Sequence, residues 1–146
     1  MSGITFDTTN CGAYFIASLT PPVLNSNGVL WVSHNGTIQM TAPVTNNQTI
    51  LIPLNVFLPS STDGKYTLMN NSTNPTAALI VSSLSWAQTG GRSVNYVLDG
   101  TSTANNVVTN LSNSTSTGAG GITKQGSGTW IIAGPGTQAA AKETLI

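Results

Sequence analysis

The stretch "GSGTWIIAGPG" (residues 126–136) places a short apolar run between glycine-rich turns, and it decides the expected fold. Short apolar or β-branched runs of this kind recur along the chain, separated by clusters of Asn, Gly, Ser, Thr and Pro. Such runs predict short strands, so we expect an all-β domain over residues 1–136. Only "TQAAAKET" has a helix-forming composition, and it predicts a tail or a short cap helix over residues 137–146.

The composition excludes several classes of partner. Only 5 % of the 146 residues are charged, with four of each sign and a formal net charge of zero. Nothing in the chain can neutralise a run of phosphates, so we expect no nucleic-acid partner. Residues 1–10 lack the pattern of a secretory signal, and the longest apolar stretch (50–58) is interrupted by Pro53 and Asn55. We therefore expect no membrane insertion.

Two stretches of similar pattern indicate a repeated module. "GTIQMTAP" (36–43) aligns with "GTWIIAGP" (128–135) through Gly, Thr and Pro at equivalent positions. Side chains of a strand alternate between its two faces, so the alignment places alternate apolar residues of both stretches on the inward face. The predicted core stack consists of Trp31, Ile38, Met40, Trp130 and Ile132.

The stretch "GGITKQGSGTWIIAG" (120–134) resembles the autotransporter-associated β-strand repeat, whose pattern is "GLTKxGxGTxxLxG". The upstream segment that opens with "ITFD" (4–7) is similar to the preceding coils of such proteins. The resemblance implies a right-handed parallel β-helix with coils of roughly 20 residues, on a cell surface or secreted. Because alternating strands and strands apolar on both faces occur together, an antiparallel β-sandwich or jelly roll remains the alternative fold.

A solenoid of about seven such coils has two open ends. Each end exposes unpaired backbone groups, and terminal repeats normally need a polar cap against edge-to-edge association. The first residues form no such cap, since "GITFDTT" (3–9) itself predicts a strand. Ile4 and Phe6 are the candidate assembly edge, and we expect a homo-oligomer or filament.

The titratable residues predict no catalytic, metal or cofactor site. Asp7, Asp63, Asp99 and Glu143 are scattered, as are Lys65, Arg92, Lys124 and Lys142. His34 is the only histidine and is expected in a turn, while Cys11 is the only cysteine, so no intrachain disulfide can form. We expect a protein that is not an enzyme and needs no cofactor.

The leading functional hypothesis is a non-enzymatic structural or surface-display protein that assembles with itself through solenoid ends or faces. The expected location is extracellular or on the cell surface, with a virion surface as the alternative. Trp31, Trp86 and Trp130 could instead stack on sugars, although core packing is the expected use of these rings. The alternative functions are therefore a carbohydrate-binding adhesin or lectin with surface glycans as partners, and a phage capsid decoration or fibre protein.

Overall fold

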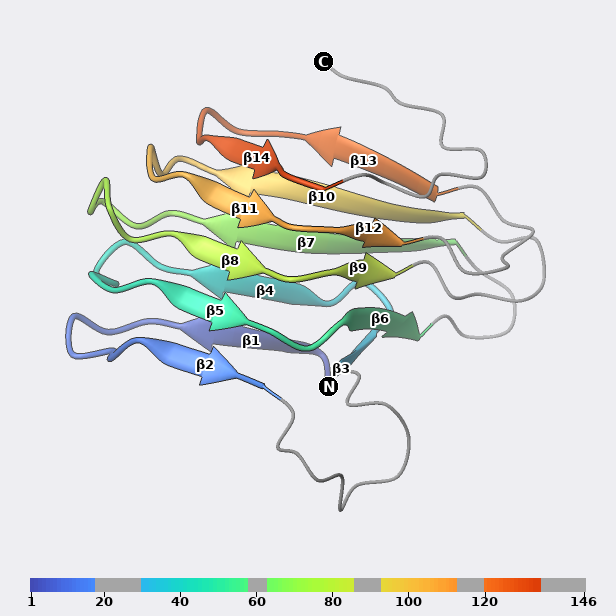
Figure 1. Ribbon diagram of the computed structural model, residues 1–146, viewed down its shortest axis with the longest axis horizontal. Coiled ribbons are helices and arrows are strands. Elements are labelled where there is room, and N and C mark those ends of the chain that lie inside the picture. Colours follow the sequence, from blue (N-terminus) through green and yellow to red (C-terminus); the bar gives the residue numbers. More distant parts are fainter. Residues whose placement is uncertain (18–29, 58–62, 86–92, 113–119, 135–146) are drawn as a thin grey trace.

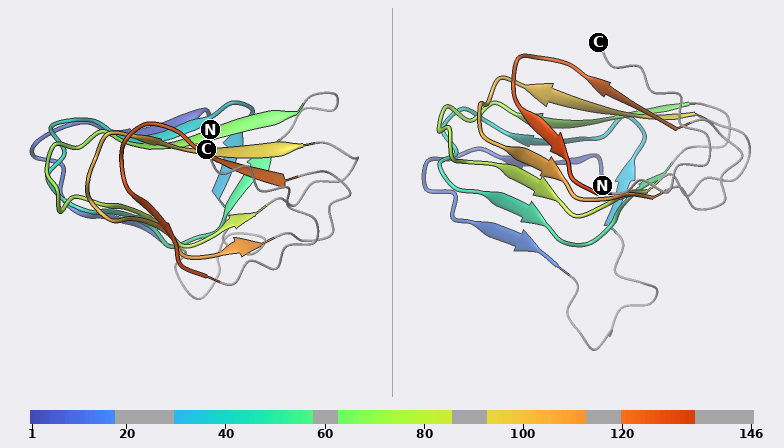
Figure 2. Two further views of the ribbon diagram at one scale, coloured as in Figure 1. Left: turned by 90° about the horizontal axis from the view of Figure 1, so that it is seen from above. Right: turned by 45° about the horizontal axis from the view of Figure 1, so that its top comes forward.

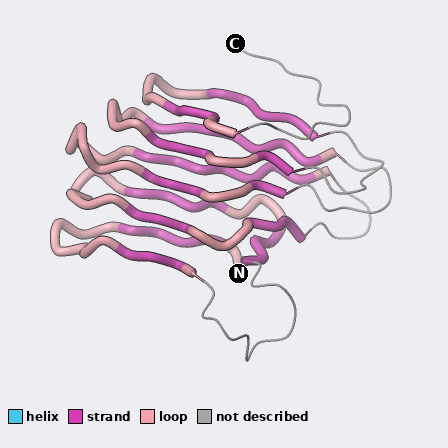
Figure 3. Tube along the Cα trace, viewed as in Figure 1, coloured by secondary structure: helices cyan, strands magenta, loops and turns pink. Residues whose placement is uncertain are grey.

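The computed structural model describes residues 1–17, 30–57, 63–85, 93–112 and 120–134. Within these ranges every regular element is a β-strand, as the composition predicted (Figure 3). No helix long and apolar enough to cross a membrane is found in these ranges. The expected tail or cap helix (137–146) lies outside the described residues.

The strands form three sheets, here named A, B and C (Figure 1). Sheet A contains β1 (Gly3–Phe6), β4 (Thr37–Met40), β7 (Gly64–Asn70), β10 (Val94–Gly100) and β13 (Gly120–Lys124). Sheet B contains β2 (Tyr14–Ile16), β5 (Gln48–Ile50), β8 (Leu79–Val81), β11 (Asn106–Val108) and β14 (Trp130–Ile132). Sheet C contains β3 (Leu30–Ser33), β6 (Leu54–Phe57), β9 (Leu84–Ser85) and β12 (Leu111–Ser112).

The chain passes through sheets A, B and C in turn and then returns beside its previous strand in sheet A. One such circuit is called a coil below, and the described residues contain five, the fifth formed by β13 and β14. All described strand pairs are parallel, so the antiparallel sandwich or jelly roll is not supported. The architecture is compatible with a β-solenoid, whose sheets enclose one interior (Figure 2).

The coils are longer and fewer than the sequence predicted. Thr5 and Gln39, which pair in neighbouring coils, are 34 positions apart, and Asn71 and Thr101 are 30 positions apart. A coil of this length supplies a strand to each of three sheets together with the connecting turns. The expectation of about seven coils of roughly 20 residues is therefore wrong, since sheets A and B each contain five strands.

The predicted alignment of residues 36–43 with 128–135 is also wrong. Thr37–Met40 is a strand of sheet A, whereas Trp130–Ile132 is a strand of sheet B. The residue of coil 5 in the ladder of Ile38 is Lys124, reached through Leu68 and Leu98. Glycine turns followed by apolar runs occur on more than one side of a coil, so local similarity does not identify the sheet.

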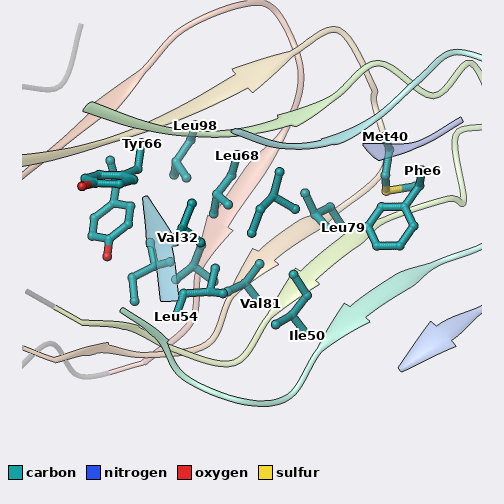
Figure 4. Close-up of a cluster of buried hydrophobic side chains, with 14 of the residues drawn as sticks. Phe6, Val32, Met40, Ile50, Leu54, Tyr66, Leu68, Leu79, Val81 and Leu98 are labelled. Carbon is teal, nitrogen blue, oxygen red and sulfur yellow. The ribbon is translucent and has the colours of Figure 1, made fainter. Parts of the chain in front are cut away.

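The core consists of inward side chains stacked in ladders along each sheet (Figure 4). In sheet A the ladder Ile38, Leu68, Leu98 is buried, and so is Ile50, Val81, Val108 in sheet B and Leu54, Leu84, Leu111 in sheet C. Alternate positions of each strand face inward, and every middle coil is covered by a coil on each side. Each ladder is thus continuous apolar surface removed from water.

Buried amides connect the coils at the corner between sheets A and B. The Nδ2 of Asn70 donates to the Oδ1 of Asn106 at 2.6 Å, and that Oδ1 also accepts the backbone N–H of Leu79 at 2.8 Å. The Nδ2 of Asn106 donates to the carbonyl of Thr129 in coil 5 at 2.9 Å. Both amides are fully buried, and these hydrogen bonds offset the cost of removing them from water.

A glycine makes this corner possible. Gly100 follows Asn70 in the same ladder and has a φ of 109°, a backbone conformation that side chains other than hydrogen rarely allow. A Cβ at Gly100 would collide with the carbonyl oxygen of Asn70. The backbone of coil 4 can therefore take this path over Asn70 only because position 100 carries no side chain.

The predicted core stack is wrong at Trp31, and at Ile132 the predicted inward direction holds but the side chain is not buried. Ile38 and Met40 are buried, at 2 % and 0 % exposure, but Trp31 is 48 % exposed. Trp31 lies in the outward ladder of sheet C, between two residues that belong to the inward ladder. Ile132 follows the buried Val108 in an inward ladder, yet it is 45 % exposed because no described strand covers it. Trp130 is half-buried.

Candidate assembly edges

The N-terminal end of the column is formed by β1, β2 and β3. β1 and β2 have a described neighbour on one side only, whereas the outer side of β3 is covered by Met1, whose carbonyl accepts the N–H of Ser33 at 2.8 Å and whose ammonium donates to the carbonyl of Trp31 at 3.3 Å. The backbone carbonyls of Ser2 and Phe6 accept the N–H groups of Thr37 and Thr41 in the next coil. In a parallel ladder alternate residues of a strand direct their N–H and C=O groups to opposite sides, so the residues between those that bond to β4 face away from β4. The backbone of Thr5 therefore faces the open side of the edge.

The predicted edge residues Ile4 and Phe6 do lie on this end strand. Phe6 is 7 % exposed and stacks on Tyr14, with ring centroids 6.1 Å apart. Tyr14 is 55 % exposed although it precedes the fully buried Gln48 in the same ladder. The end of the core is therefore an incompletely covered apolar layer.

A hollow of about 420 Å³ opens at this end, beside the first corner between sheets A and B. Its lining includes Phe6, Tyr14, the exposed Asp7 and the buried Cys11. Further apolar surface lies nearby, since Phe15 on β2 is 66 % exposed. The hollow combines aromatic walls with one carboxylate.

The C-terminal end of the described column is formed by β13 and β14. The indole Nε1 of Trp130 donates to the carbonyl of Asp99 in the coil below at 3.1 Å, so the ring lies across the corner. The ammonium of Lys124 donates to the carbonyls of Gln125 and Gly126 at 2.6 and 2.8 Å. Lys124 occupies the position that Leu98 fills in the coil below, and its cation is turned toward the corner.

Two of the other titratable side chains accept hydrogen bonds from backbone N–H groups, and the described ones form no cluster that could hold a metal ion. Asp63 accepts the N–H of Ser93 at 2.8 Å, and Asp99 accepts the N–H of Gly100 at 2.7 Å. The Nδ1 of His34 is buried without a hydrogen-bond partner. Among the described residues, no three His, Cys, Asp or Glu side chains form a group that could hold a metal ion.

Burial also acts on Tyr66, which packs against Tyr96 with the rings tilted by 44° and their centroids 6.0 Å apart. Desolvation raises the pKa of Tyr66 to about 12 from its ordinary value of 10. Tyr66 is 3 % exposed within the core, away from either end. The raised pKa of Tyr66 therefore reflects its burial in the core.

Sequence reasoning missed Tyr14, Asp7 and Lys124 as end residues. The repeat of "KYTLMNNST" (65–73) as "NYVLDGTST" (95–103) matches the pairing of β7 with β10 at a spacing of 30. The end strands pair at other spacings, since Gly3 pairs with Thr37 and Val94 with Gly120, so the repeat does not locate the end residues. Trp86, Arg92, Lys142 and Glu143 lie outside the described residues.

No protein-family model matches the chain, and no curated protein or solved structure is significantly similar to it.

Proposed function

We propose that the protein is a non-enzymatic structural protein that assembles with itself through the ends of a right-handed β-solenoid, as an extracellular filament or surface-layer component. The observation that carries this proposal is the N-terminal end, where Tyr14 belongs to an inward ladder but is 55 % exposed. An open edge with an apolar layer behind it favours association with another strand edge.

The resemblance of residues 120–134 to the autotransporter-associated repeat supports the same proposal. These residues span β13, the following corner and β14, which is the strand–turn–strand unit that the repeat implies. Proteins of that family act on a cell surface or after secretion. We therefore place this chain outside the cell.

The test is the oligomeric state of the purified chain, measured over a series of protein concentrations by light scattering and electron microscopy. We expect oligomers or filaments that grow with concentration. A monodisperse monomer at high concentration would contradict the proposal.

A matched pair of variants ties the assembly to the edge. Thr5→Pro removes the backbone N–H that faces the open side and leaves the ladder to β4 in place, because proline is tolerated on the solvent side of an edge strand. Thr5→Val keeps this N–H, and both variants lose the exposed hydrogen bond from Gln39 to the Thr5 hydroxyl. We expect Thr5→Pro to remain monomeric and Thr5→Val to assemble.

A second candidate function, carbohydrate binding, is favoured by Trp31, which faces outward on β3 and is 48 % exposed. An exposed indole can stack on the apolar face of a sugar ring. A glycan array probed with the wild-type chain and with Trp31→Ala tests this function. Binding that is lost in the variant supports it, and the absence of binding by the wild-type chain contradicts it.

A further inference from the structure

The corner between sheets A and B carries charged side chains of opposite sign at the two ends of the described column, while the N-terminal ammonium lies at sheet C, where it donates to the carbonyl of Trp31. Among the residues that the structure describes, Asp7 is the charged side chain of coil 1 and Lys124 is that of coil 5. Asp7 lines the hollow at the N-terminal end, and the Lys124 ammonium lies at the corner of the opposite end. Opposite charges at this corner favour contact of one end with the other over contact of an end with its own kind.

The ends also differ in side-chain volume at the same corner. Phe6, Met40, Asn70 and Gly100 follow one another in the inward ladder of sheet A. A Cβ at Gly126 would collide with the carbonyl of Gly100, which places Gly126 next along this ladder. The ladder thus begins with a bulky ring at the N-terminal end and finishes without a side chain at the C-terminal end.

The neighbouring ladder in sheet B joins Tyr14 to Gln48 and Leu79. In coil 4 this ladder position is occupied by Asn106, whose ladder partner in coil 5 is Trp130. If a second copy continued these ladders, its Tyr14 would follow Trp130. Two aromatic rings would then meet where each is now partly exposed.

We propose that the chain assembles head to tail, with the corner of coil 5 of one copy seated in the hollow of coil 1 of the next. This inference rests on the proposed function and specifies its contact. In that arrangement Asp7 of one copy lies beside Lys124 of the other. Phe6 of the first copy fills the space over Gly126 of the second. Sheets A and B continue as parallel ladders across the junction.

Head-to-tail contact uses two different surfaces and leaves one free end of each kind. Assembly of this type generates an open filament unless its rotation closes a ring. Lys124 has a second consequence, because an inward-pointing lysine on an edge strand discourages pairing with an edge that offers no carboxylate. The same residue would then select the partner end and limit unspecific aggregation.

Charge reversal at each end tests the contact. Asp7→Lys carries lysine at both ends, and Lys124→Asp carries aspartate at both ends. We expect each variant alone to need about a tenfold higher concentration to assemble, because a close pair of opposite charges becomes a pair of like charges. An equal mixture of the two variants should assemble as readily as the wild-type chain, because every junction between unlike copies regains an opposite pair.

Lys65→Asp is the matched control, since it makes the same charge change at an exposed position of β7 in the middle of the column. It should assemble as the wild-type chain does, and thermal unfolding of every variant shows whether the fold persists. If the wild-type chain assembles but the mixture does not, the head-to-tail contact is wrong while the proposed function stands. Loss of assembly in Asp7→Lys alone, with Lys124→Asp unaffected, points to pairing of two N-terminal ends. A monomeric wild-type chain overturns both proposals.

Discussion

The middle coils and the end coils carry inward residues in the same ladders but bury them to different degrees. Ile50 and Val108 are fully buried, whereas Ile132, which continues their ladder, is 45 % exposed. The direction of a side chain is set within its own strand, but its burial is completed by the next coil. The inward side chains of an end coil are therefore covered by a neighbouring coil on one side only.

Among the substitutions that test this difference between middle and end coils, Ile50→Ala should have the largest effect on the free energy of unfolding. Removing a fully buried isoleucine leaves a cavity between neighbouring coils, so the free energy of unfolding should fall by about 2–5 kcal/mol. Ile132→Ala removes the same atoms from the same ladder at the end and should cost less than about 1 kcal/mol when the chain is monomeric. Urea unfolding at low protein concentration measures both, and equal losses would contradict the contrast.

A smaller effect is expected from the buried amides. Asn106→Ala leaves the N–H of Leu79 and the carbonyl of Thr129 without this partner, and it should lower the free energy of unfolding by about 2–3 kcal/mol. Asn105 is exposed beside it, and Asn105→Ala should change the same quantity by less than about 0.5 kcal/mol. If urea midpoints of the two variants coincide, the amide network contributes nothing to stability.

The smallest effect is a pH dependence of the core. The pKa of Tyr66 is about 12 in the folded chain and 10 when unfolded, so the unfolded chain loses this proton first as pH rises. Stability contributed by the neutral phenol is complete below pH 10 and falls between pH 10 and 12, by up to about 1 kcal/mol per unit. Chemical denaturation across this range should show a shallower decline for Tyr66→Phe than for the wild-type chain. Identical slopes would show that Tyr66 does not report core burial.

Composition and short-range pattern predicted the all-β class, because strand and turn signals are local. The parallel arrangement was predicted from the resemblance of residues 120–134 to the autotransporter-associated repeat, since the strand pattern alone left the antiparallel sandwich open. The local pattern could not predict the register, since the Gly–Thr pairs at residues 36–37 and 128–129 look alike although the first opens a strand of sheet A and the second precedes a strand of sheet B. The orientation of Trp31 was missed for a related reason. A tryptophan suits the core by its size, but the alternation of its strand places it outside.

The candidate site was predictable only in part. Ile4 and Phe6 were placed on an open edge because the first residues already form a strand. Asp7 and Lys124 were treated as scattered charges, since their positions at opposite ends follow from the order of the coils in space. That order depends on pairing between residues about 30 positions apart, which no local pattern encodes.

The hydrogen bonds between coils run along the axis of the column, because the strands themselves lie across it. A pulling force along that axis loads these bonds in tension, so coils should peel away one after another. Each coil of about 30 residues would release roughly 100 Å of chain at about 3.4 Å per residue. A filament built from such columns would lengthen in steps under load and absorb mechanical work before it parted.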